Sequence, residues 1–380
     1  MRRRVLKVAI VGCGKIADDH AAQITRLKGC EIVGVCDREP LMARQLFERF
    51  PVKRHYSDLG ELLSDARPDV VHVTTPPDSH FPIAKLALES GCHVYIEKPF
   101  ALSEPEARVL VETAEMNGLK ATAGHNGQFR HAARRMRKLV SEGYLGGPPV
   151  HMESYYCYEL GEGDYAGALL GDKKHWVRRL PGQLLHNTIS HGIAPIAEFL
   201  TSDSPQIIAC GFTSSKLQSA GEHELVDELR VIIREDEGAT AYFTFSSRMR
   251  PSLHQFRIYG PKNGLIADPD QESLIKLRGA RFKSFAERFL PQAEFARLHL
   301  GNLRANAKLF LGNDLHMKSD LKHLIELFYR SITEGTPVPI PYREILLTAR
   351  IMDEIFAQLA ARQREAQSQE PISSRAAMSV

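Results

Sequence analysis

Two glycines and an alanine are spaced in a way that can bind a pyrophosphate. The stretch VAIVGCGKIADDH holds Gly12, Gly14 and Ala17 in a GxGxxA arrangement between an apolar run and a helical pattern. Glycines at these positions let the backbone turn tightly and approach a phosphate, whose charge the helix N-terminus stabilises. The pattern predicts a dinucleotide site that also uses the backbone of Lys15 and Ile16.

A carboxylate follows at the distance where such sites bind a ribose. The second apolar run ends in GVCD, which places Asp37 about twenty residues after the glycines. Asp37 would repel a 2'-phosphate, so NAD is favoured over NADP, although the neighbouring Arg38 softens this preference. The alternative interpretation is that the glycines only form a turn and that Asp37 caps the next helix.

Two further loops are expected at the same edge of the sheet. TTPPDSH, with Thr75, Pro76 and His80, follows the third apolar run, and YIEKPF ends the fourth run in Glu97 and Lys98. Ligands of open parallel sheets bind outside the carboxyl ends of the strands. A lone ammonium group at the end of a buried strand therefore predicts a role toward a ligand, whereas the bland alternative is a surface lysine that keeps its charge in water.

The elements that must position these residues alternate regularly. Over the first 125 residues a strand pattern is followed by a helical pattern four times, which is typical of a parallel sheet covered by helices. Ser103 and Glu106 form a capping box, and Gly91 and Gly118 stand where helices should end. We therefore expect an α/β fold whose N-terminal Rossmann domain spans residues 1–125.

The pattern changes after residue 125. A basic helix from about Ala132 to Glu142 precedes several long runs rich in β-branched and aromatic residues, which predict a large, mostly antiparallel sheet with an open face. We assign residues 126–365 to a second α/β domain for substrate binding and oligomerisation. Within it, residues 282–316 predict an unusually long helical segment, read as a lid, an interface or a membrane-surface helix. Residues 366–380 are polar and predict a disordered tail.

The totals describe an ordinary globular protein. The 380 residues are 43% hydrophobic and 25% charged, with a formal charge of +3, which argues against a nucleic-acid partner. Six isolated cysteines without a CxxC pair predict reduced thiols and a cytoplasmic location. The basic start MRRRVLKVAIVG predicts a first strand and not a signal peptide, and no apolar run is long enough for a transmembrane segment.

In this order the motifs VGCGKIADDH, TTPPDSH, SGCHVYIEKPF and AGHNGQF resemble the Gfo/Idh/MocA family, named after glucose-fructose oxidoreductase, inositol dehydrogenase and rhizopine catabolism. The ALxxGxHVxxEKP block from Ala87 to Pro99 is its most specific part. The resemblance implies a Rossmann domain followed by an α/β domain with an open-faced sheet. It also implies NAD(P)-dependent oxidation or reduction at a hydroxyl carbon, usually of a sugar, cyclitol or nucleotide-sugar.

The resemblance also assigns residues. Lys98 corresponds to the lysine of the family's EKP motif, near the nicotinamide and the reacting oxygen, and Asn126 is a further cofactor-side candidate. The segment PGQLLHNTISH resembles the family's second motif, in which His191 matches the histidine and Asn187 stands where an aspartate is usual. This departure matters because an amide cannot stabilise an imidazolium with a full negative charge.

The chemistry of alcohol oxidation fits these residues. It needs a group that accepts the hydroxyl proton, for which a histidine such as His191 is suited, and a positive group near the developing alkoxide, for which Lys98 is suited. Asn187 and His191 are four residues apart and share one face of a helix. His186 and His191 are five apart and diverge, so no metal site is expected. The alternative for His191 is a core histidine.

Substrate contacts are harder to assign. Trp176 and Arg178, in the loop KKHWVRRLPG before the His191 helix, offer an aromatic face and a guanidinium to an anionic sugar, and His186, Asn187 and His191 follow. A solvated basic loop explains the first two equally well.

We therefore expect a sugar-like small-molecule substrate, NAD as cofactor and a homodimer or homotetramer. A redox-neutral elimination or epimerisation with bound NAD and a non-catalytic sensor or accessory subunit remain alternatives.

Overall fold

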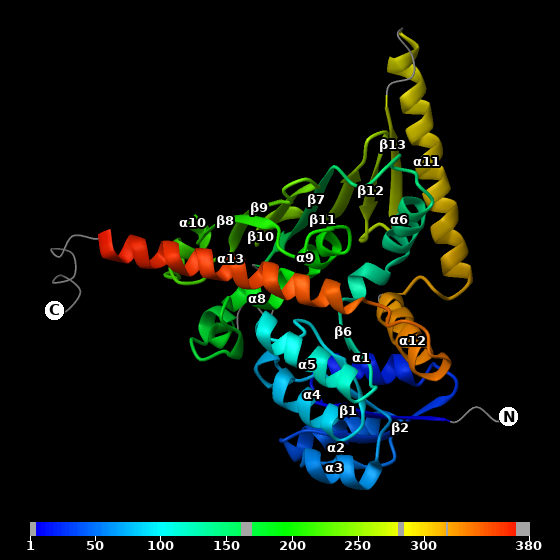
Figure 1. Ribbon diagram of the computed structural model, residues 1–380, viewed down its shortest axis with the longest axis vertical. Coiled ribbons are helices and arrows are strands. Elements are labelled where there is room, and N and C mark those ends of the chain that lie inside the picture. Colours follow the sequence, from blue (N-terminus) through cyan, green and yellow to red (C-terminus); the bar gives the residue numbers. More distant parts are fainter. Residues whose placement is uncertain (1–4, 161–168, 280–284, 317, 370–380) are drawn as a thin grey trace.

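The computed structural model describes residues 5–160, 169–279, 285–316 and 318–369 (Figure 1). Its first sheet has six parallel strands, which confirms the predicted Rossmann architecture. In spatial order the strands are β3 (His55–Tyr56), β2 (Cys30–Cys36), β1 (Leu6–Val11), β4 (Val70–Val73), β5 (His93–Ile96) and β6 (Ala121–Ala123). The short strand β3 and the helix after it are elements that the sequence patterns above do not single out.

Helices cover both faces of this sheet, as crossover connections between parallel strands require. They are α1 (Lys15–Ile24), α2 (Pro40–Arg49), α3 (Leu59–Ala66), α4 (His80–Glu89) and α5 (Glu104–Met116), with a single 3₁₀ turn η1 (Pro77–Ser79) before α4. Half of the predicted capping box is present: the Ser103 hydroxyl accepts from the Glu106 amide, whereas the Glu106 carboxylate accepts from the Leu102 amide at 3.0 Å, one residue before the N-cap.

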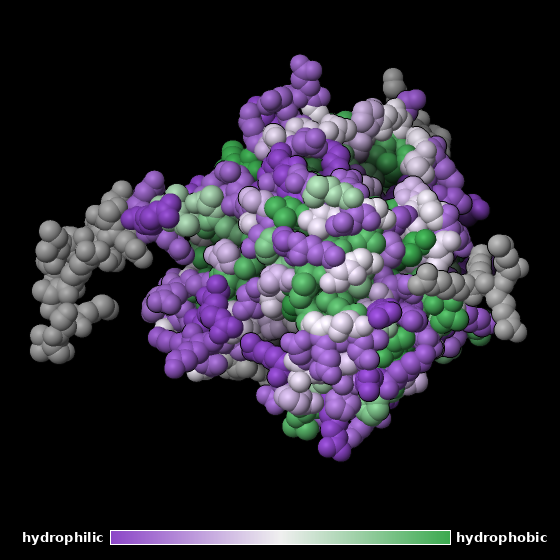
Figure 2. Space-filling model, turned by 60° about the horizontal axis from the view of Figure 1, so that its bottom comes forward, coloured by the Kyte–Doolittle hydropathy of each residue, from purple (hydrophilic) through white to green (hydrophobic). Residues whose placement is uncertain are grey.

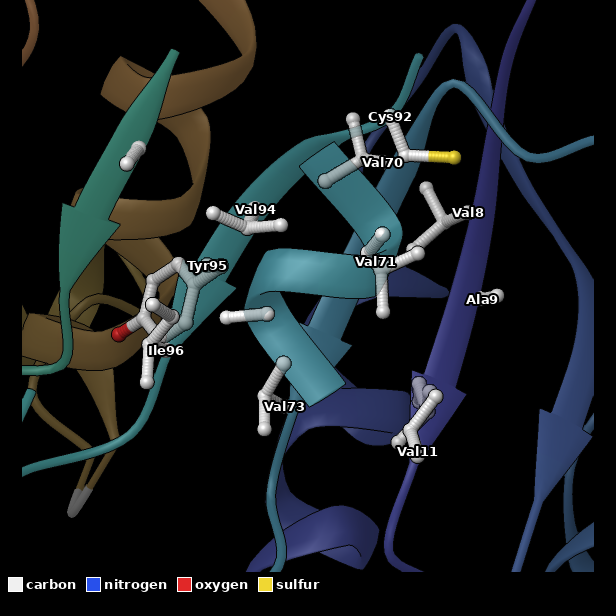
Figure 3. Close-up of a cluster of buried hydrophobic side chains, with 14 of the residues drawn as sticks. Val8, Ala9, Val11, Val70, Val71, Val73, Cys92, Val94, Tyr95 and Ile96 are labelled. Atoms are coloured by element: carbon white, nitrogen blue, oxygen red, sulfur yellow. The ribbon is translucent and has the colours of Figure 1, made fainter. Parts of the chain in front are cut away.

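The core of the first domain is built from strands buried on both faces. Side chains of β1, β4 and β5 interlock between the helix layers (Figure 3), and Val8, Val71 and Val94 have no exposed surface. Runs of β-branched residues are typical of such doubly covered parallel strands. Because the strands are fixed by this packing, the loops at their carboxyl ends start from rigid positions.

The second sheet has seven strands and is mostly antiparallel, as predicted, with one parallel pair, β7 with β10. In spatial order the strands are β13 (Ser273–Arg278), β12 (Asn263–Asp268), β11 (Arg248–Tyr259), β7 (His151–Glu159), β10 (Thr240–Ser246), β9 (Glu228–Arg234) and β8 (Gln206–Phe212). One face is covered by helices, whereas Ile208, Phe212, Ile232 and Tyr242 are exposed on the other. This open face agrees with the sequence-based prediction.

The remaining helices follow the first domain in the sequence. They are the 3₁₀ turns η2 (Asn126–Phe129) and η3 (Trp176–Arg179) and the helices α6 (His131–Ser141), α8 (Gln183–Thr188), α9 (Ser190–Ala197), α10 (Ser215–Ser219), α11 (Ala286–Leu311), α12 (Ser319–Glu334) and α13 (Tyr342–Gln369). The segment 282–316, predicted as helical, contains α11. Helix α13 includes the first four residues of the predicted tail, 366–369, and residues 370–380 lie outside the described residues.

Helix α12 follows the second sheet in the sequence but packs on the first domain. Leu321, Leu324 and Phe328 belong to the same buried cluster as the strands of the first sheet. Its N-terminal Lys318 also pairs with Asp19 of α1 at 2.9 Å. The first domain therefore shares its core with a helix from the C-terminal part of the chain. No helix of the described residues is long and apolar enough to cross a membrane.

Candidate active site at the edge of the parallel sheet

The turn after β1 has the geometry that its glycines predict. Gly12 has a φ of 94°, and a Cβ there would lie 2.6 Å from the Thr75 backbone nitrogen. Only glycine fits this left-handed turn without displacing the neighbouring loop. A Cβ at Gly14, in contrast, would meet nothing within 4 Å, so the space in front of this residue is open. The two glycines thus serve different purposes, a close backbone contact and an open approach.

The N-terminus of α1 is ready to receive an anion. Gly14 is the N-cap and supplies no side-chain hydrogen bond, and Lys15, Ile16 and the buried Ala17 form the first turn. Uncapped amide groups at a helix N-terminus bind phosphate through hydrogen bonds and the helix dipole. These residues fit a pyrophosphate, and the predicted cofactor-binding turn is thereby brought together in space.

Asp37 lies beside this turn at the end of β2. Its Oδ2 accepts from the Cys13 amide at 2.7 Å and its Oδ1 accepts from the Glu39 amide at 2.9 Å. The two bonds fix the carboxylate at the edge of the open space and leave lone pairs that a hydroxyl donor such as a ribose would fit. Arg38 is exposed. Asp37 therefore both orders the glycine turn and fits the ribose of a dinucleotide.

The loop after β4 has a structural part and an open part. His80 is buried, and its ring nitrogens lie 2.8 Å from the carbonyl oxygens of Pro99 and Thr75, so it ties two loops of the edge together. The Thr75 hydroxyl is buried without a hydrogen-bond partner among the described residues, and Pro76 is exposed. We therefore place His80 as a support of the site, whereas Thr75 and Pro76 border it.

Lys98 crosses from the first domain to the second. Its Nζ donates to the Asn187 carbonyl oxygen at 2.8 Å and lies 3.4 Å from the Asn187 side-chain oxygen. Burial lowers the pKa of Lys98 below its usual value, while the charge of Glu97 opposes this effect. Asn187 accepts the ammonium without adding a negative charge, so the departure from aspartate favours a less basic lysine.

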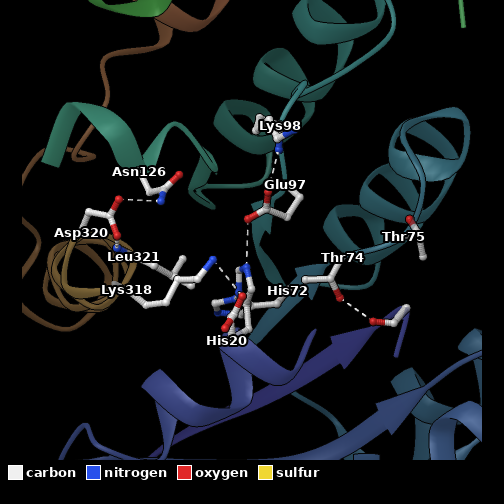
Figure 4. A network of polar contacts seen from close by, with 12 residues as sticks. His20, His72, Thr74, Thr75, Glu97, Lys98, Asn126, Lys318, Asp320 and Leu321 are labelled. Carbon is white, nitrogen blue, oxygen red and sulfur yellow. Dashed lines mark hydrogen bonds and ion pairs between the residues drawn. The ribbon is translucent and has the colours of Figure 1, made fainter. Parts of the chain in front are cut away.

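A buried chain of hydrogen bonds holds Glu97 behind this lysine (Figure 4). His20 Nε2 lies 3.0 Å from Glu97 Oε1, His20 Nδ1 lies 2.8 Å from His72 Nδ1, and His72 Nε2 lies 2.8 Å from the Tyr329 hydroxyl. One tautomer assignment satisfies every pair: Tyr329 donates to His72, His72 to His20 and His20 to Glu97.

The same chain sets the charge of Glu97. Burial raises the pKa of this carboxyl, but the hydrogen bond and charge of His20 and the charge of Lys98 outweigh burial and leave the pKa below its usual value. Burial also lowers the pKa of His72 well below its usual value. At the neighbouring strand, a Cβ at Gly124 would lie 2.9 Å from Glu97, so only a glycine leaves room for this carboxylate. Glu97 is thus an ionised group in a fixed position.

His191 lies on α9, which begins directly after α8. The predicted single helix through Asn187 and His191 is interrupted at Ile189, where α8 ends. A Cβ at Gly192 would lie 2.2 Å from the Phe243 ring, and the Ser154 hydroxyl donates to the Gly192 carbonyl at 2.8 Å. Because no side chain separates α9 from the sheet at this residue, His191 is held close to β7.

The His191 ring is placed for proton transfer. It stacks on Tyr156 with ring centroids 5.2 Å apart, and its ring nitrogens have no hydrogen-bond partner among the described residues. Burial, followed by the positive charge of Lys98, lowers the pKa of His191 well below its usual value. The ring is therefore neutral near neutral pH and can accept a proton.

A cavity of about 980 Å³ that opens to solvent begins at His191. Tyr156, which lines it, stacks between His191 and His254, and His254 Nδ1 lies 2.7 Å from Asp270 Oδ2. Lys98 and Asn187 do not line this cavity. His191 does line it, and its pKa is lowered by the charge of Lys98. The cavity residues Tyr156, His254 and Asp270 come from separate strands and loops, and no spacing in the sequence relates them.

Asn126 lines the same cavity at its border with the first domain. Its amide donates to Asp320 Oδ2 at 2.8 Å, and Arg130 Nε lies 3.4 Å from the same oxygen. This places Asn126 at the junction of both domains and α12.

Three predicted substrate residues lie elsewhere. Arg178 forms a buried ion pair with Glu222 at 2.6 Å, Trp176 packs against the core of the second domain, and His186 is buried against Phe356. None of them lines the cavity. Arg178 already has a buried counter-charge and is therefore not proposed as an anion ligand; the alternative of a structural role for this loop fits better.

Residues 6–125 match the oxidoreductase family with an NAD-binding Rossmann fold, GFO_IDH_MocA. This domain is therefore similar to the Gfo/Idh/MocA family, as its motifs predict. D-glucoside 3-dehydrogenase of Escherichia coli (strain K12) is 34% identical over 142 residues, which cover 37% of this chain and 40% of that protein. Glycosyl hydrolase family 109 protein 2 of Akkermansia muciniphila is 26% identical over 208 residues, covering 51% and 42%. The chain thus spans about two fifths of the length of these curated relatives.

The fold resembles solved structures over nearly the whole chain. The WlbA dehydrogenase from Bordetella pertussis, solved with NADH and UDP-GlcNAcA, superposes with a TM-score of 0.75 at 15% sequence identity, covering 94% of this chain and 96% of that chain. At this identity the likeness concerns the arrangement of both domains.

Proposed function

We propose that the protein is an NAD-dependent oxidoreductase that acts on a secondary alcohol of a sugar or cyclitol. The observation that carries the proposal is the position of Lys98, which reaches from the cofactor edge to Asn187 while its charge acts on His191 at the mouth of the cavity. This combination of a cation and a neutral base is what oxidation of a carbinol requires.

Each residue of the site would have a separate role in cofactor binding or catalysis. When bound, NAD accepts or supplies the two electrons and the hydrogen at the reacting carbon. The turn from Gly12 to Ala17 would hold its pyrophosphate and Asp37 a ribose. His191 would accept the hydroxyl proton, because its ring is neutral and faces the cavity. Lys98 would donate a hydrogen bond to the oxygen as negative charge develops on it. Asn187 would orient the Lys98 ammonium.

The cavity lining supports an uncharged polyhydroxyl substrate. Arg130, the arginine that lines the cavity, lies 3.4 Å from Asp320 and 3.6 Å from Asp270. Glu198, also at the cavity, is paired with Arg137 at 2.9 Å. Because Arg130 already faces two carboxylates and Glu198 is already paired, hydroxyl groups that both donate and accept suit the lining better than a phosphate or carboxylate does.

A spectrophotometric assay tests the proposal. Purified protein is incubated with NAD or NADP and a panel of neutral sugars, cyclitols, sugar acids and nucleotide-sugars, and reduced nicotinamide is followed by absorbance. We expect turnover with NAD and a neutral polyol, and a preference for NAD that Asp37→Ala weakens. A chain that binds NAD but reduces it with no member of the panel would contradict the dehydrogenase.

The second candidate is a redox-neutral reaction in which NAD stays bound, such as elimination or epimerisation. The match to a protein named glycosyl hydrolase family 109 favours keeping it, since this match spans more of the chain than that to the D-glucoside dehydrogenase. Product formation from a glycoside without net reduction of NAD, traced by chromatography, would select this candidate. Unchanged turnover in Lys98→Ala would mean that the site is wrongly assigned, whereas a protein that binds NAD but shows neither activity would favour a sensor or accessory subunit.

We further propose that two copies associate through the open face of the second sheet, where Ile232 and Tyr242 are exposed. The proposed cytoplasmic location rests on the six cysteines, all of which are free. Light scattering on the purified protein, with Ile232→Arg as the disrupting variant, tests the association.

A further inference from the structure

Helix α11 presents its apolar residues to solvent on the side away from the protein. Phe289, Leu300, Leu303 and Phe310 are 74%, 54%, 65% and 70% exposed. Figure 1 shows α11 along the outer edge of the molecule, beside β13. Figure 2 shows the molecule with the lower end of Figure 1 turned forward. On the face seen there, apolar residues form separate groups among hydrophilic ones. A continuous exposed stripe on a helix needs a separate explanation.

Polar contacts attach α11 to the domain. The Asn302 amide accepts from the Leu274 backbone nitrogen at 3.2 Å and donates to the Leu274 carbonyl at 3.1 Å, so it pairs with the free edge of β13. Asn306 donates to the Gln271 carbonyl at 2.9 Å, and Glu294 pairs with Arg278 at 3.0 Å. These contacts hold the inward side of α11 against the domain, and the apolar stripe lies on the opposite side of the helix.

The stripe has the spacing of a helix-pairing seam. Its residues alternate at intervals of four and three through three heptads, and all of them are exposed: Phe289, Ala293, Ala296, Leu300, Leu303, Ala307 and Phe310. A 3.5-residue period keeps one seam facing a partner helix along its whole length. A helix that only covers its own domain has no need of such a period on its solvent side.

The order of large and small residues selects the partner. If a second copy of α11 lies antiparallel, with the twofold axis near Leu298, then Phe289 meets Ala307 of the second copy, Leu303 meets Ala293 and Leu300 meets Ala296. Each layer then joins one large side chain to one alanine, which lets two helices approach closely without a void. A parallel pair would instead set Phe against Phe and Ala against Ala.

We propose that α11 is a second self-association surface, on which an antiparallel copy of the same helix packs through the stripe from Phe289 to Phe310. This inference rests on α11 alone and is independent of the proposed function. Combined with the proposed contact through the open sheet face, it would generate a tetramer with two kinds of twofold interface.

Sedimentation velocity of the full chain over a concentration series tests the proposal. Leu303→Glu introduces two charges into the paired seam and should weaken association at least about 100-fold, removing one assembly step. The matched control is Lys308→Glu, an exposed residue of the same helix outside the stripe, which should change association less than about threefold. Ile232→Arg on the open sheet face separates the two interfaces: in that background Leu303→Glu should give a monomer.

The variant Ala307→Phe distinguishes specific antiparallel pairing of α11 from nonspecific hydrophobic association. It enlarges the apolar surface, so nonspecific aggregation or binding to a membrane surface would increase. In the antiparallel pair it sets Phe against Phe289 of the second copy, and association should fall about tenfold or more. An assembly that Leu303→Glu leaves intact, or that Ala307→Phe strengthens, overturns the proposal. So does a chain that stays monomeric and co-sediments with phosphatidylserine vesicles. Thermal melting confirms that each variant is folded.

Discussion

The two sides of the candidate site differ in how completely the protein satisfies its own polar groups. On the cofactor side, the Glu97 and Asp37 carboxylates are both held by hydrogen bonds from buried or backbone donors. On the cavity side, the His191 ring has no such partner among the described residues and is positioned only by stacking on Tyr156. The carboxylates of the first side are fixed before any ligand arrives, whereas the second side leaves the His191 ring nitrogens for the substrate.

This difference agrees with the extent of the sequence likeness. The family match ends at residue 125, and the solved structures share the fold at low identity beyond it. A cofactor common to many enzymes requires a fixed geometry, while each substrate requires its own lining. The geometry of the cofactor side can therefore be inferred from relatives, whereas the substrate preference of the cavity side has to be inferred from the residues of this protein.

The largest effect is expected where both sides meet. Lys98→Met keeps the length of the side chain but removes the positive charge beside the developing alkoxide, and should lower kcat/KM at least about 1,000-fold. The variant should remain folded, because the native ammonium is disfavoured by burial. Lys85→Met, at an exposed lysine of the same domain, is the control for steady-state kinetics. Near-normal turnover in Lys98→Met would remove the lysine from the mechanism.

The next effect concerns the cavity side alone. His191→Asn retains a polar side chain but no base, and kcat should fall about 100-fold while the affinity for NAD stays within about twofold. Calorimetry of NAD binding measures the second quantity. The control is His186→Asn on the adjacent helix, outside the cavity, which should keep the wild-type kcat. If His191→Asn abolished NAD binding, the division between the two sides would be wrong.

Restoring the aspartate usual in the family sharpens the comparison further. In Asn187→Asp a negative charge adjoins the Lys98 ammonium and favours its charged form, so the pKa of Lys98 rises. If activity requires the ammonium, the alkaline limb of the pH profile should move to higher pH by about one unit. A limb that stays in place, or moves to lower pH, would show that another group controls it.

The smallest effect is expected far from the chemistry. Tyr329→Phe removes the hydroxyl that satisfies His72 Nε2 at the end of the buried chain, and should lower the free energy of unfolding by about 1 kcal/mol. Urea titration measures this loss. Tyr342→Phe, which removes a hydroxyl that accepts from the Ala121 amide, offers a partly buried tyrosine for comparison. An unchanged unfolding curve would mean that the hydrogen bond between Tyr329 and His72 does not contribute to stability.

The sequence predicted the elements whose signals are local. Gly12, Asp37 and Lys98 follow strands, and strand ends of a parallel sheet meet at one edge, so their proximity could be inferred. The hydrogen-bond chain from Glu97 to Tyr329 could not, because bonded neighbours in it are separated by up to 257 residues and its histidines and tyrosine look like ordinary core residues. The ion pair of Arg178 could not be predicted for a related reason: its partner Glu222 lies in a different segment, and no spacing relates them.

Helix α12 has a consequence for how the chain matures. The cofactor-binding domain begins at the first strand, yet Leu321, Leu324 and Phe328 of its core are synthesised only after the whole second sheet. On the ribosome, residues 6–125 would therefore emerge with part of their apolar surface uncovered, and Tyr329 would not yet reach His72. The nucleotide site would reach its final rigidity only after α12 has been synthesised and has packed on the first domain.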